Sequence, residues 1–211
     1  MKNKFLFFCI VILFLVKSSH VLAQPLDYIL LKSINQSYTE SGSKPLKIIT
    51  ESVTPISISA PLSMLIVSYL KHDKTLQTKA LSVSAAFLLN GISTSALKLS
   101  IKRDRPYVSY PGEIVKHTSS GSYSFPSGHT SSAFATATSL SIEFPKWYVI
   151  APSYLWAGAM GYSRMYLGVH YPSDVFIGAL IGSGSSIASH YLIKALQRDR
   201  KRKAVKTIYK D

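Results

Sequence analysis

The stretch Ser163-Arg-Met-Tyr-Leu-Gly-Val-His170-Tyr-Pro-Ser-Asp174 leads directly into a segment without acidic or basic residues, Val175–Ile193. Proline suits the first position of a helix, so we expect a helix that begins near Pro172, with Asp174 in its first turn and His170 just ahead of it. The uncharged segment has about the length needed to cross a hydrocarbon core of about 30 Å. A surface helix of a soluble protein normally carries a charged face, which this segment lacks.

Similar uncharged windows recur along the chain. They are Val53–Leu70, Ala80–Leu97, Gly121–Ile142, Trp147–Ser163 and Val175–Ile193. They are rich in Ser, Gly, Ala and Thr, and Gly178 and Gly182 have the small-xxx-small spacing of closely packed membrane helices. The windows predict an all-α fold, a helical bundle of five transmembrane helices. A soluble bundle that buries similar helices is the alternative, because the mean hydropathy is only +0.18.

The N-terminus indicates an export signal. Lys2 and Lys4 precede the apolar stretch Phe5–Val16, and Val21-Leu22-Ala23 supplies small residues for cleavage. We therefore predict a signal peptide over residues 1–23, with an uncleaved signal anchor as the alternative, and a periplasmic segment over 24–52 that contributes a short outer helix. Residues 53–194 are then the helical-bundle domain, and 195–211 a basic cytoplasmic tail. Cys9 is the sole cysteine, so the mature chain would hold no disulfide.

The formal net charge of +14 arises largely from positions outside the windows. The basic residues crowd the C-terminal tail, and no nucleic-acid recognition motif is present, so anionic lipid is the expected neighbour of that tail. If residue 24 begins outside the cytoplasmic membrane, alternating windows place Lys71, Lys74, Lys79, Lys146 and the tail on the inner side, as the positive-inside rule requires. We thus expect a multi-pass protein of the bacterial inner membrane; a soluble periplasmic protein is the alternative.

Residues suited to phosphate chemistry lie at or near the ends of the windows. They are Lys98, Arg105 and Pro106; Pro126, Ser127, Gly128 and His129; and Ser163, Arg164, His170 and Asp174. Arg offers a planar fork of donors to phosphoryl oxygens and Lys a compact charge. Imidazole titrates near neutral pH and serves as nucleophile or acid. The proposed topology brings all three groups to the outer face of the membrane.

The order and spacing of these residues resemble those of the type 2 phosphatidic acid phosphatase superfamily, which includes bacterial class A acid phosphatases and vanadium haloperoxidases. Its pattern, Lys-x6-Arg-Pro, Pro-Ser-Gly-His and Ser-Arg-x5-His-x3-Asp, is matched at every fixed position between Lys98 and Asp174. The resemblance implies that His170 is the nucleophile, that Asp174 orients it, and that His129 is the general acid. It implies that the phosphoryl oxygens are bound by Lys98, Arg105, Ser127, Gly128 and Arg164, with neither metal nor cofactor.

The resemblance implies a phosphatase that hydrolyses a phosphate monoester or pyrophosphate, without metal, through a phosphohistidine intermediate. The expected substrate is a membrane lipid of the phosphatidic acid, phosphatidylglycerol phosphate, polyprenyl pyrophosphate or lipid A type. A soluble periplasmic acid phosphatase of broad specificity and a vanadate-dependent haloperoxidase are the alternatives. No nucleic-acid partner is expected.

Two segments next to these residues have open or ordinary interpretations. Lys102, Arg103 and Asp104 are taken as ordinary loop charges. Tyr107–Tyr123, which contains Pro111-Gly112 and Gly121, is either a loop over the active site or a simple connector.

Overall fold

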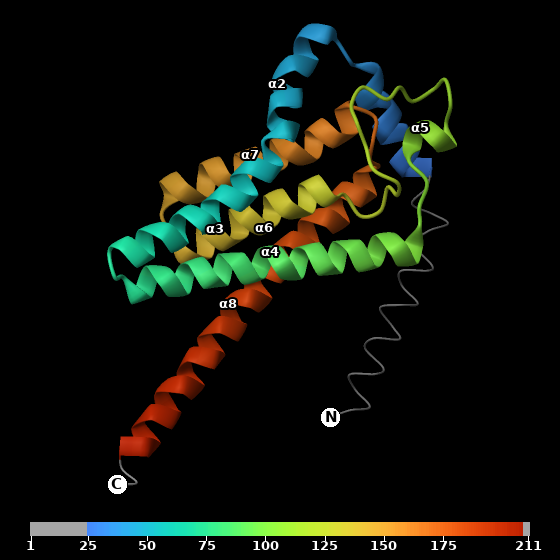
Figure 1. The fold of residues 1–211 in the computed structure, drawn as a ribbon. Helices are drawn as coiled ribbons and strands as arrows, with labels where there is room; N and C mark the ends of the chain where they lie inside the picture. Colours follow the sequence, from blue (N-terminus) through green and yellow to red (C-terminus); the bar gives the residue numbers. More distant parts are fainter. Residues whose placement is uncertain (1–24, 209–211) are drawn as a thin grey trace.

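The structure, a computed structural model, describes residues 25–208, and every regular element in that range is helical. A helix over residues 25–36 comes first. The elements that follow are α2 (Glu40–Glu51), α3 (Val53–Leu70), α4 (Lys74–Ile101), α5 (Pro106–Ser109), α6 (Gly128–Glu143), α7 (Trp147–Tyr166) and α8 (Pro172–Ile208). The prediction of an all-α helical bundle is confirmed (Figure 1). The predicted signal peptide, residues 1–23, lies outside the described residues.

Helices α4, α6 and α8 begin where local chemistry favours a helix start. The Asp73 carboxylate accepts from the backbone N–H groups of Thr75 and Leu76 at 2.9 and 3.0 Å, which caps α4. Ser127 caps α6 through the N–H of Thr130, as the Pro-Ser-Gly-His turn predicts. Pro172 opens α8, as expected from its fixed backbone angle.

Helix α6 forms the centre of the bundle, and small side chains let its neighbours approach closely. Ala133, Ala135 and Ala137 are buried on it. A Cβ atom at Gly178 of α8 would lie 2.7 Å from the backbone oxygen of Ser127, so the two helices meet backbone to backbone. The small-residue spacing in the last uncharged window therefore marks a real helix contact.

Hydroxyl groups link the helices inside the bundle. Ser139 donates to Ser186 at 2.9 Å and so joins α6 to α8, and Ser189 of α8 donates to the backbone oxygen of Ser82 on α4 at 2.6 Å. Such interhelical hydrogen bonds satisfy polar groups where no water is available, each with a stabilisation of about 0.6–2 kcal/mol in membrane bundles.

Three helical segments are long and apolar enough to cross a membrane: Glu40–Leu70, Lys74–Ser109 and Pro172–Asp199. At most 33% of each hydrophobic window is buried, and Leu88 and Ile92 on α4 are 65% and 68% exposed. These apolar side chains therefore face outward, as lipid contact requires. The chain is a membrane protein, and these three segments are its candidate spans by length and composition.

The other two predicted spans, Gly121–Ile142 and Trp147–Ser163, are not among these three apolar segments. The window Gly121–Ile142 is only partly helical, because residues 121–127 form a loop and α6 has 16 residues. At a rise of about 1.5 Å per residue, α6 is shorter than a hydrocarbon core. Its neighbour α7 also falls outside the three apolar segments. The count of five transmembrane helices stays a prediction.

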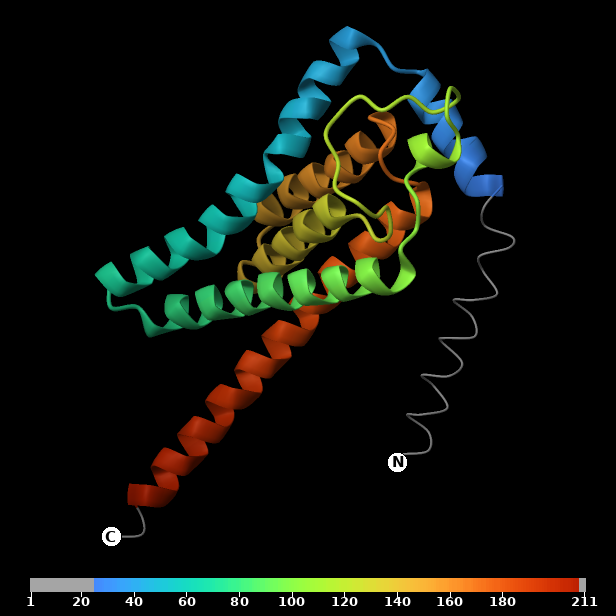
Figure 2. The same ribbon diagram turned by 45° about the vertical axis from the view of Figure 1, so that its right-hand side comes forward.

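Helix α8 extends beyond the bundle. It crosses α4 and continues away from it, so its C-terminal end lies apart from the other helices (Figures 1 and 2). The backbone shows no break at residue 194, since α8 runs on to Ile208. The division between a core domain and a basic tail at that position stays a prediction.

We expect Gly182→Ala to lower the thermal unfolding temperature of the detergent-solubilised protein by several degrees, because the new Cβ would clash with the Ser131 backbone oxygen on α6. Overpacking of this kind costs roughly 1–3 kcal/mol. Tryptophan fluorescence during heating measures it. Gly184→Ala is the matched control, because a Cβ there meets nothing within 4 Å. Equal unfolding temperatures for the two variants would contradict the close α6–α8 contact.

Candidate functional site

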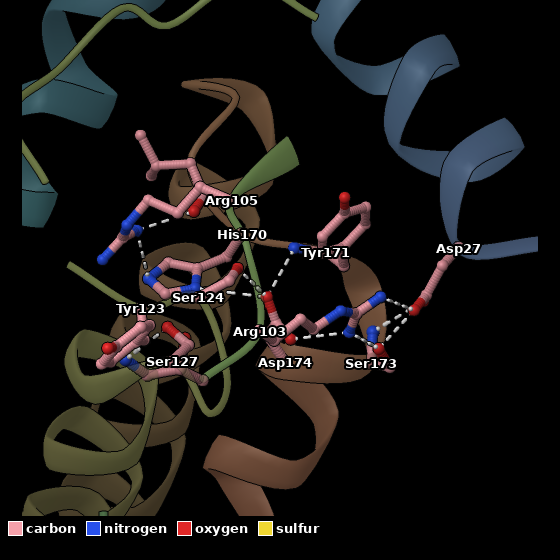
Figure 3. Close-up of polar contacts among 12 residues, drawn as sticks. Asp27, Arg103, Arg105, Tyr123, Ser124, Ser127, His170, Tyr171, Ser173 and Asp174 are labelled. Carbon is pink, nitrogen blue, oxygen red and sulfur yellow. Dashed lines mark hydrogen bonds and ion pairs between the residues drawn. The ribbon is translucent and has the colours of Figure 1, made fainter. Parts of the chain in front are cut away.

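The residues that the sequence singles out converge at one end of the bundle. Lys98 lies near the end of α4, Arg105 precedes α5, and Ser127, Gly128 and His129 open α6. Arg164 lies in the last turn of α7, His170 in the loop before α8, and Asp174 in the first turn of α8. The helices alternate in direction, so these termini meet on the same side (Figures 1 and 3).

The loop between α7 and α8 presents His170. Gly168 adopts φ +71° there, a conformation that side chains rarely tolerate, and an added Cβ would meet the Val115 backbone and lie 2.9 Å from Asn35 Nδ2. The turn brings His170 to 2% exposure. A glycine at this position is therefore needed for the loop to reverse and aim the imidazole into the site.

The hydrogen bonds of His170 define its tautomer. Arg105 Nη1 lies 3.2 Å from His170 Nε2, and a guanidinium can only donate, so Nε2 carries the lone pair. The proton is then on Nδ1, which lies 3.4 Å from Asp174 Oδ2. That contact is too poorly aligned to count as a hydrogen bond, and Nδ1 has no other partner in the described chain. The unprotonated nitrogen thus faces the cations, and Asp174 lies behind the ring.

Burial is the largest influence on the charge of His170. It lowers the pKa of the imidazole from 6.5 to about 4, against the opposing effect of the Asp174 carboxylate. Arg105 and Arg164 act in the same direction as burial. His170 is therefore neutral at neutral pH, with a lone pair available on Nε2.

Asp174 is fully buried and tightly held. Its Oδ1 accepts from Arg103 Nη1 at 2.8 Å, and its Oδ2 accepts from the Tyr171 N–H at 3.0 Å and from the Ser124 hydroxyl. These donors keep the carboxylate ionised and fix its orientation toward the His170 ring (Figure 3).

Arg103 is the main correction to the sequence analysis, because it is not an ordinary loop charge. Its Nη1 donates to Ser173 at 2.7 Å, and its Nη2 pairs with Asp27 Oδ2 at 2.9 Å. Asp27 also accepts from the Ser173 N–H and hydroxyl. An ion-pair chain therefore runs from Asp27 through Arg103 to Asp174 (Figure 3). Asp27 is distant in sequence from both partners, so local patterns could not reveal it.

The other basic side chains of the site, Lys98, Arg105 and Arg164, are not neutralised by carboxylates in this way. Arg105 and Arg164 are 4% and 2% exposed, yet neither they nor Lys98 form an ion pair with any carboxylate in the described part of the chain. Arg164 donates to Thr50 at 2.6 Å, and its Nε has no partner there. Buried charges without counter-ions are costly. The arrangement indicates a binding site for an anion.

His129 lies among these cations. It is close enough to Arg164, His170, Arg105 and Lys98 for their charges to act on it. Burial, together with these charges, lowers the pKa of the His129 imidazole well below its usual value, so a further positive charge is disfavoured there until an anion joins the cluster. Ser127 is buried and its hydroxyl bonds to Thr130 at 2.8 Å, so in the structure it caps α6 and thereby places Gly128 and His129.

The segment Tyr107–Tyr123 lies over the site. Arg105 Nε donates to the Gly121 oxygen at 2.9 Å, and Lys98 donates to the Tyr123 oxygen at 2.9 Å. Buried Asn35 holds the middle of the loop, with bonds of 2.8 and 3.0 Å to the backbone of Val115. Of the two interpretations left open by the sequence, the covering loop is the one observed.

The chemistry of the described residues favours anion binding over metal binding. No group of three or more His, Cys, Asp or Glu side chains within residues 25–208 is arranged to hold a metal ion. Fold and site together define a membrane helical bundle with an electropositive, histidine-containing site at one end.

Family comparison agrees with this class. The sequence model of the PAP2 superfamily matches residues 79–198, more than half of the chain. The protein therefore belongs to the PAP2 superfamily, and the resemblance seen in the motifs is confirmed.

Among relatives, a lipid A 4′-phosphatase of Bacteroides thetaiotaomicron is 37% identical over 90 residues, which are 41% of this chain and 40% of that protein. An undecaprenyl-diphosphatase of Sulfolobus acidocaldarius is 31% identical over 129 residues, which are 61% of this chain and 60% of that protein. The chain thus spans less than two-thirds of the length of these relatives.

Solved structures of similar fold include a transmembrane PAP2-type phosphatidylglycerolphosphate phosphatase of Bacillus subtilis. It has a TM-score of 0.68 and 24% identity, over 92% of this chain and 94% of that one, and the likeness concerns the fold. LpxE of Aquifex aeolicus has a TM-score of 0.60 and 28% identity, over 76% of this chain and 92% of that one.

Arg103→Gln is expected to lower the unfolding temperature, because it leaves the buried Asp27 carboxylate unpaired, which typically costs about 3–5 kcal/mol. The double variant Asp27→Asn/Arg103→Gln removes both charges and should recover much of that stability. Turnover should stay about 10–100-fold low in both, with a smaller change in KM, because Asp174 Oδ1 has lost its Arg103 donor in both variants.

Thermal unfolding measures the change in stability, and phosphate release measures the change in turnover. Lys102→Gln is the control, since Lys102 is exposed next to Arg103. Recovery of turnover together with stability in the double variant would show that Arg103 acts only as a structural ion pair.

Proposed function

We propose that this protein is a metal-independent phosphatase that hydrolyses the phosphate monoester or pyrophosphate of a membrane lipid. The observation that carries the proposal is the cluster of half-buried Lys98 with buried Arg105 and Arg164, which lacks carboxylate partners in the described chain. Arg105 lies 3.2 Å from the unprotonated Nε2 of His170. An anion with several oxygens would compensate this cluster, and a nucleophile already points into it.

In the proposed reaction, His170 Nε2 attacks phosphorus and the bond from phosphorus to the ester oxygen breaks. The Nδ1 proton stays on the ring, where Asp174 stabilises the positive charge that develops. Lys98, Arg105, Arg164 and the N–H of Gly128 bind the phosphoryl oxygens; Ser127 contributes by capping α6.

His129 would complete both half-reactions. It protonates the leaving alkoxide, and the negative phosphoryl group favours its protonated form among the cations. It then accepts a proton from water, which attacks the phosphohistidine and releases inorganic phosphate and neutral His170. Protons and bonds balance without a metal ion.

Lipid is the proposed substrate class because the site lies at the ends of membrane-crossing helices. The relatives named above act on lipid A and undecaprenyl diphosphate, according to their names. Phosphatidic acid, phosphatidylglycerol phosphate, polyprenyl pyrophosphate and lipid A are the headgroups to compare. A soluble phosphatase of broad specificity would instead leave the membrane in a carbonate wash.

We further propose that the protein lies in a bacterial inner membrane with its site toward the periplasm. Support comes from the basic residues at the far end of the bundle. Lys71 and Lys74 flank the α3–α4 turn, and Lys146 precedes α7, opposite the site. The positive-inside rule assigns that end to the cytoplasm.

Phosphate release from the four lipid headgroups, measured in detergent with a metal chelator, tests the function. We expect at least one lipid to be hydrolysed, and His170→Ala to lower its turnover by at least about 1,000-fold through loss of the nucleophile. Labelled phosphate should remain on the wild-type enzyme as an acid-labile adduct. Full turnover by His170→Ala would remove the proposed mechanism.

The lowered pKa of His170 gives a direct prediction about its titration. A lowered value means that the neutral form persists as pH falls and that the ring gains its proton only well below pH 6.5, toward about 4. Nitrogen-15 NMR of histidine-labelled protein measures this, with His170→Phe to assign the signal. Asp174→Asn should move the midpoint lower still, because the carboxylate raises the value. A midpoint at or above 6.5 would contradict the buried, cation-surrounded ring.

A further inference from the structure

A second concave site lies at the end of the bundle opposite His170. A cavity of about 560 Å³ opens between the first turns of α4, the end of α6 and the C-terminal half of α8. Side chains of both α4 and α8 line it, and the two helices diverge toward this end of the bundle (Figures 1 and 2). Its polar lining includes Lys74, Thr78, Lys79, Glu143, His190 and Lys194. None of these residues takes part in the proposed reaction.

The cavity carries excess positive charge. Its one carboxylate, Glu143, is already occupied, because Oε1 lies 2.9 Å from His190 Nδ1. Lys79 donates to the Glu143 backbone oxygen at 2.6 Å and lies over the Phe144 ring at 4.5 Å, so its ammonium is held in place. Lys74 and Lys194 pair with no carboxylate in the described part of the chain. The cavity therefore attracts an anion.

The lining also contains apolar side chains. Lys74, Thr75 and Thr78 lie in the first turns of α4, and Leu81 follows nearer the middle of the bundle. On α8, Ile193 lies between His190, on its inner side, and Lys194 and Gln197. The cavity therefore combines cations and hydroxyls with two apolar side chains, Leu81 and Ile193, in one lining.

We propose that this cavity binds the phosphate headgroup of an anionic phospholipid in the leaflet opposite the active site. Lys74 and Lys194 would receive the phosphate, and an acyl chain would lie along Leu81 and Ile193. Basic pockets between transmembrane helices bind lipid phosphates in this way. Asp73 lies nearby, but its carboxylate is turned to the N–H groups of Thr75 and Leu76 and does not line the cavity.

Bound lipid would have a structural consequence. Gln197 donates to Thr78, so the cavity walls already join α8 to α4. A phosphate held between Lys74 on α4 and Lys194 on α8 would add a second connection at the point where the helices part. The lipid would thereby stabilise the packing of the two helices that carry Lys98 and Asp174 at their other ends.

The test compares phosphatidylglycerol, a phosphodiester outside the proposed substrate class, with phosphatidylcholine at equal concentration in detergent. Thermal unfolding and native mass spectrometry of the full chain measure stabilisation and bound lipid. We expect phosphatidylglycerol to raise the unfolding temperature by several degrees and to stay bound. Lys74→Gln/Lys194→Gln should weaken its binding on the order of 30-fold, because each lysine contributes about 1 kcal/mol to such contacts.

The matched control is Lys71→Gln/Lys146→Gln, which removes the same charge near the same end but outside the cavity lining. It should keep the effect of phosphatidylglycerol, as should Lys74→Arg/Lys194→Arg. If the control variant lost the stabilisation by phosphatidylglycerol to the same extent, the effect would come from general attraction between lysines and anionic lipid. That result would overturn the proposal. Equal stabilisation by inorganic phosphate that is lost in Lys74→Gln/Lys194→Gln would mean that the cavity takes free phosphate, and would also overturn the proposal. Hydrolysis of a soluble phosphate ester should be unchanged in the cavity variants, so failure here is distinguishable from failure of the proposed function.

Discussion

The structure depends on positive charge that is buried without a counter-ion. Arg105 and Arg164 are almost inaccessible, yet the described chain provides them with hydroxyl and carbonyl oxygens and no carboxylate. Such an arrangement opposes folding, since isolated buried charges are costly. It is retained where an external anion supplies the missing charge. The helix termini, the covering loop and the orientation of His170 are all arranged around this cluster.

Arg103 and Arg105, two positions apart in the sequence, have different roles at this site. Arg103 is neutralised by Asp27 and Asp174, so it can stabilise the fold and orient the carboxylate behind His170. Arg105, two positions later, bonds to His170 Nε2 and keeps its charge for an anion. Arg103 is paired with two carboxylates and stabilises the packing of the site, whereas Arg105 has no carboxylate partner in the described chain. The placement of the acidic residues accounts for this difference. The ion-pair chain also connects the helix over residues 25–36 to the site.

The small and hydroxyl-bearing residues of α6 and α8 make this convergence possible. Because backbone approaches backbone at Gly178 and Gly182, the N-termini of both helices lie side by side and direct their N–H groups into the same region. Bulkier residues would separate them and widen the cluster of cations. At the far end, where α8 leaves α4, the packing opens into a second basic cavity.

Much of this architecture is encoded locally. The uncharged windows predict helices, Pro172 and Ser127 mark where two of them begin, and the spacing of Lys98, Arg105, His129, Arg164, His170 and Asp174 predicts the proposed site. These features depend on near neighbours in the chain, so the sequence by itself determined them. The extent of α6, the covering loop over Lys98, and the pairing of Arg103 with Asp27 depend on contacts between distant segments. Only the tertiary structure decided these, because the free energy of burying a charge is set by what packs around it.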